Sequence, residues 1–396
     1  MESVVFVDPD ATGTFLAAVA GSLMTITSII LSLVLLALQQ SASSLTSQVY
    51  DQFMRRRINQ VAIGFFLGLS LYSLIILSMI GGRFNPVISV AIAFLCTGMA
   101  LFLLPTLIYA VTQQIRSGNI ISSIASLTVS ARSRQAELLR GTRRAPTADL
   151  RSLALARADS AGFVDRIDLG RLEKLLDGEE GVEVVLLVSV GDYVTAGEPI
   201  ADLRGSEPPG DVPEDLDEAV REALVLVPAR NILHDPRYGL EQLGNIGWTA
   251  ISTAKSSPAP ALEVIKALRR LFNDLRFEPE EGTTSDGLRV VYRDDVMRDI
   301  FDTFESLAVS ASESRQHQSV REIVHALSVI ASVAEGHSRE RIAKVTRVIL
   351  ATLNAHVLTT GLSDSLLELK RATDSMGETE LSREIEDAHR AALDVG

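Results

Sequence analysis

The chain has 396 residues, of which 47% are hydrophobic and 22% charged, and it carries a formal net charge of −13. Its bases are mixed with carboxylates rather than gathered in one place, which argues against a nucleic-acid partner. Cys96 is the only cysteine, so no intramolecular disulfide can form, and we interpret it as a small core residue. Hydrophobic residues are concentrated before Arg116, so the composition predicts a membrane part followed by an acidic soluble part.

Three apolar runs, at residues 15–38, 60–80 and 87–111, contain no Asp, Glu, Lys or Arg. At about 1.5 Å of rise per residue, each run is long enough to cross a hydrocarbon core of about 30 Å. We therefore predict three transmembrane helices, in a membrane domain that covers residues 1–140. Because proton-coupled carriers place ionisable residues within the membrane, these charge-free runs disfavour such transport.

Charges beside the runs predict the orientation of the chain. Arg55, Arg56 and Arg57 lie between the first two runs and further arginines follow the third, whereas residues 1–13 carry only acids. By the positive-inside rule, the amino terminus is outside and the large carboxyl-terminal part is cytosolic. Residues 41–59 also have the pattern of an interfacial amphipathic helix, which would hold the three arginines at anionic lipid headgroups. A topology signal without such a helix is the alternative.

Small and polar residues recur along the first run at spacings of 4, 3, 4 and 7, so they share one face of a helix. This stripe consists of Gly21, Thr25, Ser28, Ser32 and Gln39. It can line a pore, or it can pack against another helix, since membrane helix interfaces are rich in small residues. Gly64 and Gly68 of the second run form a further small pair, which we interpret as a packing notch.

Beyond the third run, a helix at 113–140 leaves the membrane, a linker follows at 141–147, and residues 150–205 form a small β-rich, barrel-like module. Within the module we predict a strand at 162–168, a short helix at 169–176, a strand at 182–190 and a short strand pair around the turn at 197–199. Residues 191–200 resemble the hairpin of biotinyl- and lipoyl-type barrels. A cofactor arm would need a lysine at an exposed hairpin tip, but the only lysine from 161 to 203 is Lys174, on the predicted helix. We therefore expect no cofactor.

A linker rich in Pro, Gly and acid at 207–218 leads into a mainly helical cytosolic domain at 216–396. The predicted helices lie at 240–251, 260–272, 294–312, 317–333, 338–358, 363–372 and 378–393, with a lone strand at 288–292. Asp235 followed by Pro236 is a common helix-start signal, and we interpret it as a turn rather than a ligand site.

Sequence signals for catalysis and metal binding are missing. None of the six histidines is spaced i, i+4 from another, as a helical metal site would require. There is no Gly-rich phosphate loop ending in Lys-Ser or Lys-Thr, no Gly-x-Ser-x-Gly elbow and no Cys-x-x-Cys pair. We therefore predict no catalytic and no metal-binding residues, and we expect that the protein is not an enzyme. An enzymatic function would require a polar pocket around Asp235 and Ser252.

Several motifs in order resemble the bacterial membrane proteins catalogued as domain of unknown function 2254. The matching segments are 21–27, 31–39 and 52–64 in the membrane part, and 234–243, 250–252 and 301–302 in the soluble part. The family motif, carried over by this resemblance, comprises Asp235, Pro236, Gly239, Ser252, Pro258 and Asp302. The resemblance implies an integral protein of the bacterial inner membrane whose function is uncharacterised.

The chain departs from the family pattern at three places. Ser256-Ser257-Pro258 stands where the family usually has Asn-Asp-Pro, Tyr109-Ala110 where it usually has a His pair, and Gln48 where it usually has an Arg. If those polar groups carry the activity of the family, this member is altered or inactive. The family also tends to begin with one further span, so we expect either a divergent member or a start assigned too late.

Two functions are compatible with these features. The first is a homo-oligomeric channel or pore in the lipid bilayer, with the stripe facing the axis and the cytosolic part gating or sensing. Oligomerisation is required because three spans per chain cannot enclose a pathway alone. The second is a membrane-anchored scaffold or binding module that meets a cytosolic protein or a small ligand. Replacing the stripe by leucine distinguishes the two, because only a pore should lose its function.

Overall fold

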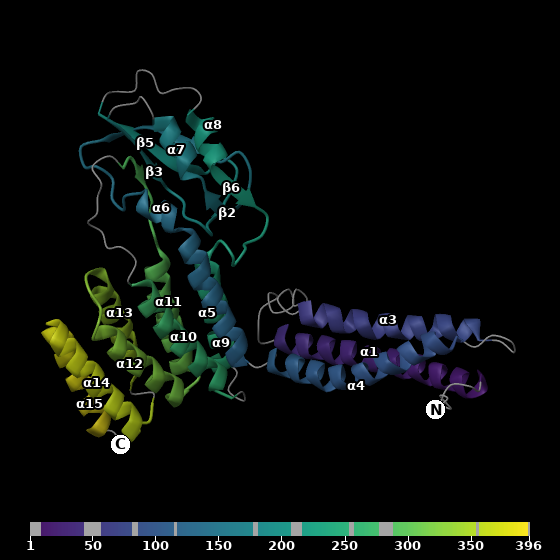
Figure 1. Ribbon diagram of the computed structural model, residues 1–396. Helices are drawn as coiled ribbons and strands as arrows, with labels where there is room; N and C mark the ends of the chain where they lie inside the picture. Colours follow the sequence, from purple (N-terminus) through teal and green to yellow (C-terminus); the bar gives the residue numbers. More distant parts are fainter. Residues whose placement is uncertain are drawn as a thin grey trace. The chain divides into compact units, whose positions relative to one another are not determined.

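The computed structural model describes residues 9–42, 57–80, 86–114, 117–176, 181–206, 216–252, 257–276, 288–353 and 356–394. The chain divides into two compact units (Figure 1). Met1–Ile120 is the membrane unit, and Ile121–Gly396 is the soluble unit.

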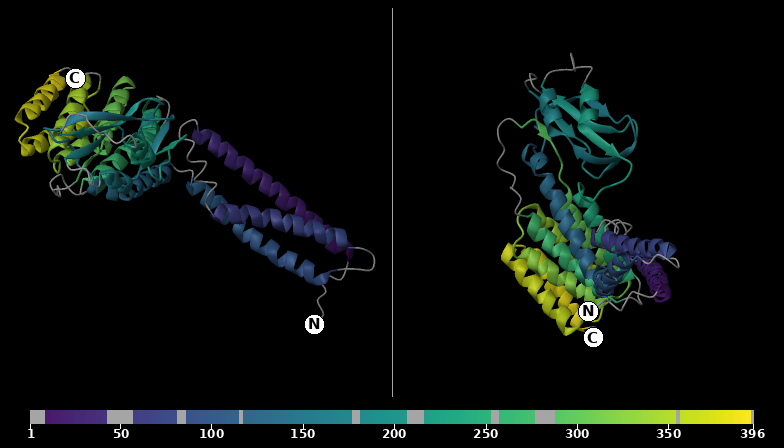
Figure 2. Two further views of the ribbon diagram at one scale, coloured as in Figure 1. Left: turned by 90° about the horizontal axis from the view of Figure 1, so that it is seen from above. Right: turned by 45° about the vertical axis from the view of Figure 1, so that its right-hand side comes forward.

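The described part of the membrane unit holds three long helices, α1 (Pro9–Ala42), α3 (Arg57–Met79) and α4 (Val87–Gln114). Each contains a stretch that is long and apolar enough to cross a membrane, which confirms the three predicted spans. The helices run side by side (Figure 2), and α1 packs mainly on α3. Buried residues at these contacts include Leu16, Leu23, Phe66 and Ile76. Most of the interfacial helix predicted at 41–59 lies outside the described residues.

α5 (Ser117–Arg134) crosses the boundary between the two units, and α6 (Ala136–Arg140) follows it, where the sequence predicts one continuous helix. The two are separated at Gln135. The guanidinium of Arg132 is buried and donates two hydrogen bonds to the buried carboxylate of Asp294. This pair fixes the end of α5 to the start of α11 (Val296–Glu313).

The described strands form two sheets. The larger has the order β1-β5-β3-β7, from Arg151–Arg157, Pro199–Gly205, Val182–Leu186 and Val290–Val291. The smaller has the order β4-β2-β6, from Tyr193–Val194, Gly162–Ile167 and Leu224–Val227. All pairings are antiparallel except that of β3 with β7. α7 (Leu169–Leu176) and α8 (Leu216–Ala223) contribute to the same core, which includes Leu172, Val184, Val194 and Leu203.

The strand pairing differs from the sequence prediction. β4 and β5, expected to pair around the turn at Gly197, belong to different sheets, because both edges of β5 are occupied by β1 and β3. β7, expected as a lone strand, pairs with β3. β1 and β6 were not predicted as strands. Over the described ranges the strands do not close into a barrel, so the barrel-like module is not confirmed.

Helices complete the soluble unit at the seven predicted places. The first begins four residues before its predicted start, the fifth ends six residues before its predicted end, and the sixth extends beyond both predicted ends. Besides α11, they are α9 (Pro236–Ser252), α10 (Ala259–Leu275), α12 (His317–Ala331), α13 (His337–Thr352), α14 (Thr360–Met376) and α15 (Thr379–Asp394). α9 packs on α10 and α11, and α12 packs on α10 and α14. Phe272, Phe301 and Phe304 are fully buried between these helices. α9 and α11 are therefore packed against a buried helical core.

Candidate functional site

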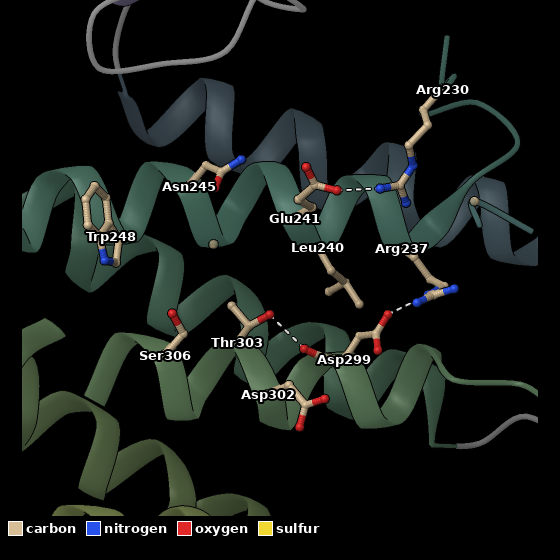
Figure 3. A pocket seen from close by; sticks show the side chains of 12 residues that line it. Arg230, Arg237, Leu240, Glu241, Asn245, Trp248, Asp299, Asp302, Thr303 and Ser306 are labelled. Atoms are coloured by element: carbon tan, nitrogen blue, oxygen red, sulfur yellow. Dashed lines mark hydrogen bonds and ion pairs between the residues drawn. The ribbon is translucent and has the colours of Figure 1, made fainter. Parts of the chain in front are cut away.

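A hollow of about 520 Å³ opens between α9 and α11 (Figure 3). Leu240 forms part of its wall, and the remaining lining is mostly polar or charged. The lining residues are Gly191, Arg230, Arg237, Leu240, Glu241, Gly244, Asn245, Trp248, Asp299, Asp302, Thr303 and Ser306. Most come from the two helices, and Gly191 comes from the turn between β3 and β4. The hollow therefore lies where the β module meets the helices.

Asp235 organises one end of the hollow. Its Oδ1 accepts a hydrogen bond from the Tyr238 backbone N–H (3.0 Å), which caps α9 just before Pro236. Its Oδ2 accepts from Arg230 Nε (2.6 Å), and Arg230 also donates to Glu241. The predicted helix-start turn is thus confirmed, and the same carboxylate aligns an arginine of the hollow.

The turn from Ser189 to Asp192 reaches this end of the hollow from the β module. Gly191 has a φ of +93°, and a Cβ there would lie 2.6 Å from Asp235 Oδ2, so only glycine fits. The Ser189 hydroxyl donates to the Arg293 carbonyl oxygen (2.8 Å), and the Val190 N–H donates to the Tyr292 hydroxyl (3.3 Å). Burial raises the pKa of Tyr292 to about 12, which keeps this hydroxyl protonated.

Arg237 joins three elements at the floor of the hollow. Its Nε donates to Asp299 Oδ2 on α11, and its Nη1 donates to Asp192 Oδ1 in the β3–β4 turn, both at 2.6 Å. Burial by itself lowers the pKa of Arg237, but the hydrogen bonds and charges of Asp299 and Asp192 outweigh it and hold this pKa above its usual value. Arg237 is therefore a permanent cation between two carboxylates.

Trp248 stands at the other end of the hollow. Its side chain is 53% exposed, and Asn245 and Ser306 are exposed beside it. A second hollow, of about 500 Å³, extends from here over α11 and α13 and shares Trp248, Asp302 and Ser306 with the first. Its rim carries the ion pairs Asp302–Arg341 (3.4 Å) and Glu305–Lys344 (2.8 Å). The two hollows therefore adjoin at Trp248, Asp302 and Ser306.

The residues of the predicted family motif are only partly brought together. Asp302 lines both hollows, and Asp235 reaches the first through Arg230. Gly239 instead faces α5, where a Cβ would overlap the Thr128 hydroxyl. Ser252 donates to the Thr249 carbonyl oxygen (3.4 Å), and Pro258 precedes α10, so neither contributes to the hollow.

The stripe on α1 lies on the outside of the membrane unit. Gly21, Thr25, Ser28 and Ser32 are all exposed, and the Thr25 hydroxyl donates to the Gly21 carbonyl oxygen (2.9 Å). Gly64 and Gly68 are also exposed, and a Cβ at either would meet nothing within 4 Å, so this notch packs against none of the residues that the structure describes. The Gln39 side chain and the Arg55, Arg56 and Arg57 side chains lie outside the described part.

Sequence reasoning did not single out the residues that give the hollow its character. Arg230, Arg237 and Asp299 belong to no recognised motif, and the sequence analysis predicts no role for Trp248. Helical spacing could have indicated part of the hollow. Glu241, Asn245 and Trp248 follow one another along the polar face of a predicted helix. Within the described ranges, no group of three or more His, Cys, Asp or Glu side chains is placed to hold a metal ion.

Comparison with known proteins gives one family. A family model described as predicted membrane protein (DUF2254) matches residues 1–332. Uncharacterised proteins of Mycobacterium bovis and Mycobacterium tuberculosis are 26% identical over 276 residues, which cover 65% of this chain and 51% of each relative. The chain thus spans about half the length of the curated relatives that it matches. No solved structure matches it.

Proposed function

The chain belongs to the DUF2254 family of predicted membrane proteins, and we propose that it is a membrane-anchored binding protein with a small-ligand site between α9 and α11. The hollow of about 520 Å³ carries this proposal. Its volume falls within the range of about 300–1,000 Å³ that is usual for small-molecule sites. Hydrogen-bonding groups and one exposed indole line it together, which is the combination that orients a polar ligand.

The charges of the lining indicate the class of ligand. Arg230 and Arg237 are each held by two carboxylates, and Asp302 adds a fifth carboxylate, which pairs with Arg298 and Arg341, so five acids face four arginines. An anionic ligand would have to displace a carboxylate from an arginine, whereas a cation gains from the acidic excess. The indole of Trp248 also attracts a cationic group over its face. We therefore expect a neutral or cationic polar ligand.

Tryptophan fluorescence tests this proposal directly, because Trp248 is the only tryptophan in the chain. We would titrate the purified full chain in lipid nanodiscs with arginine, spermidine, neutral sugars and nucleoside phosphates. The expected result is a saturable change in emission, together with a higher Tm, for a cationic or neutral compound.

A matched pair of variants locates the binding. Ser306→Phe fills the hollow between Trp248 and α11 and should abolish the response. Ser375→Phe adds the same group at an exposed position of α14 and should leave the response unchanged. An unchanged response in Ser306→Phe, or no response of the wild-type chain to any compound, contradicts the proposal.

A homo-oligomeric pore is the second candidate, and the outer faces of the membrane helices favour it. Ile88, Leu95 and Phe102 on α4 are 75 to 81% exposed and suit acyl chains. The outer face of α1 carries Thr25, Ser28 and Ser32 beside the exposed apolar side chains of Met24, Ile29 and Leu31. The Thr25 hydroxyl bonds back to its own helix, but hydroxyls on an outer face gain little from lipid, so contact of this face with water or with a second copy would account for the stripe.

Planar-bilayer conductance tests the pore. A pore predicts single-channel currents that Thr25→Leu and Ser28→Leu reduce strongly, since the larger side chains narrow and dry the passage. The control Ile88→Leu alters the apolar face of α4 without changing its character. A silent wild-type chain under voltage, tension and osmotic stress, with the mass of a monomer in nanodiscs, excludes the pore and the oligomer alike.

A further inference from the structure

Two histidines 39 positions apart in the sequence meet at one corner of the soluble unit. The Nδ1 atoms of His317 and His356 are 3.1 Å apart, and the rings are nearly perpendicular, with centroids separated by 5.2 Å. His317 is the first residue of α12, and His356 lies between α13 and α14. Their contact therefore joins segments that are distant along the chain.

Hydrogen bonding restricts how many protons this pair can hold. His356 Nε2 contacts the Ser312 hydroxyl (3.2 Å), which in turn contacts the Thr352 hydroxyl (2.8 Å). A hydrogen bond between two Nδ1 atoms requires one of them to carry a proton and the other to accept it. If both imidazoles are charged, both Nδ1 atoms are donors, and two positive charges face each other at hydrogen-bond distance.

The surroundings do little to offset a second charge. His356 is only 8% exposed, so water cannot solvate it well. The charged residues nearest in sequence to this corner are Glu313 of α11, Arg315 in the following turn, Arg321 and Glu322 of α12, Arg347 of α13 and Asp364 of α14. In the part of the chain that the structure describes, none of them forms a hydrogen bond or ion pair with either imidazole.

We propose that His317 and His356 form an acid-sensitive clasp, which holds the end of α11, the start of α12 and the segment leading into α14 together when at most one imidazole is charged. Protonation of both rings removes the mutual hydrogen bond and loosens this corner. The clasp uses none of the residues that line the ligand hollow between α9 and α11.

The sign of the pH dependence follows from burial. Burial lowers the pKa of His356, and the charge of His317 lowers it further. The open form therefore takes up protons at a higher pH than the closed form does. The stability that the clasp contributes is present above the ordinary value of 6.5 and is lost as the pH falls below it.

Hydrogen exchange of the full chain in nanodiscs tests the clasp. Rates at pH 7.5 and 5.5 are compared after correction for the intrinsic pH dependence of exchange. We expect protection in peptides covering 312–320 and 356–362 to fall on the order of tenfold at pH 5.5, with no change in α10. His317→Gln keeps a donor for His356 but cannot become charged, so the loss of protection at pH 5.5 should be smaller than in the wild-type chain, with only the part due to the burial of His356 remaining. His337→Gln changes a mostly exposed histidine and should behave as wild type.

Three results would overturn the clasp. They are equal protection of the wild-type chain at both pH values, a pH dependence in His317→Gln that is as large as in the wild-type chain, and loss of protection when EDTA is added at pH 7.5. The last would make the two nitrogens metal ligands instead. If His317→Gln does not fold, the wild-type chain labelled with 13C-histidine decides. Two well-separated titration steps for the pair support the clasp, and two ordinary ones overturn it.

Discussion

Gly239 marks a close approach between α9 and α5. Thr128 lies opposite it, fully buried, with its hydroxyl donating to the Ile124 carbonyl oxygen (2.9 Å). A methyl group at position 239 would overlap that hydroxyl and lie 3.1 Å from Thr128 Cβ. We expect Gly239→Ala to lower the free energy of unfolding by about 1–3 kcal/mol, because extra atoms in a packed contact force their neighbours to move. Chemical denaturation of the purified full chain measures this loss.

Two further variants separate this overlap from helix propensity. Thr128→Ala removes the hydroxyl, so the double variant with Gly239→Ala should recover part of the loss. At Gly170 in α7, the nearest atom to an added Cβ is 3.6 Å away. Gly170→Ala should therefore be neutral or slightly stabilising, since alanine has the higher helix propensity. A Gly239→Ala chain as stable as wild type would show that the close approach is not required.

Asp235 gives one carboxylate two structural roles, the cap of α9 and the partner of Arg230. Asp235→Asn keeps an oxygen for the cap but removes the charge, whereas Asp235→Ala removes both. Because the pair is buried, we expect the alanine variant to lose about 3–5 kcal/mol of unfolding free energy and the asparagine variant less. Denaturant unfolding curves rank the two. Equal losses in both variants would mean that the cap contributes nothing.

At the scale of elements, Arg237 couples the β module to the helices. The pair with Asp192 reaches the β3–β4 turn, and the pair with Asp299 reaches α11. A double-mutant cycle of Arg237→Gln with Asp299→Asn should give a coupling energy of about 1–3 kcal/mol, because both side chains are mostly shielded from water. The same cycle on the exposed pair Arg270–Asp274 should give less than about 0.5 kcal/mol. Additive losses at Arg237 and Asp299 would refute the coupling.

Periodicity predicts the helices of this chain well and the strand pairing poorly. α7 has its predicted bounds because Leu169, Leu172 and Leu176 recur at helical spacing and are all buried. By contrast, β6 pairs with β2, and β7 pairs with β3, across several intervening elements. No local pattern encodes such a partner. The strand partners of β5 show the same limit, since the turn glycine Gly197 was recognised but the hairpin around it does not form.

The ligand hollow escaped prediction for a related reason. Its walls come from α9, from α11 and from the turn at Gly191, which lie far apart in the sequence. A hydrophobic pattern identifies the buried faces of α9 and α11 but not the opposing polar faces that enclose a cavity. The family resemblance drew attention to Asp302 and Asp235, whereas Arg237 becomes recognisable only once its two carboxylate partners are placed.

At the scale of the whole molecule, the family and the three apolar helices establish a membrane protein, and its orientation is a prediction from charge. Arginines lie between the first and second spans and after the third span, whereas the amino terminus is acidic. Positive residues are retained in the cytoplasm during insertion. We therefore expect the ligand hollow and the histidine clasp, both beyond the third span, to face the cytosol.

Cysteine labelling tests this orientation cleanly, because Cys96 is the only native thiol. In a Cys96→Ala background, Asn85→Cys lies in the sequence between the second and third predicted spans, and Ser338→Cys lies on α13. A maleimide that cannot cross the membrane should label Asn85→Cys in spheroplasts and should label Ser338→Cys only after permeabilisation. Both sites should react equally in detergent, which controls for accessibility. Labelling of Ser338→Cys in sealed spheroplasts would reverse the topology and would place the hollow outside, where extracytoplasmic compounds become the relevant ligands.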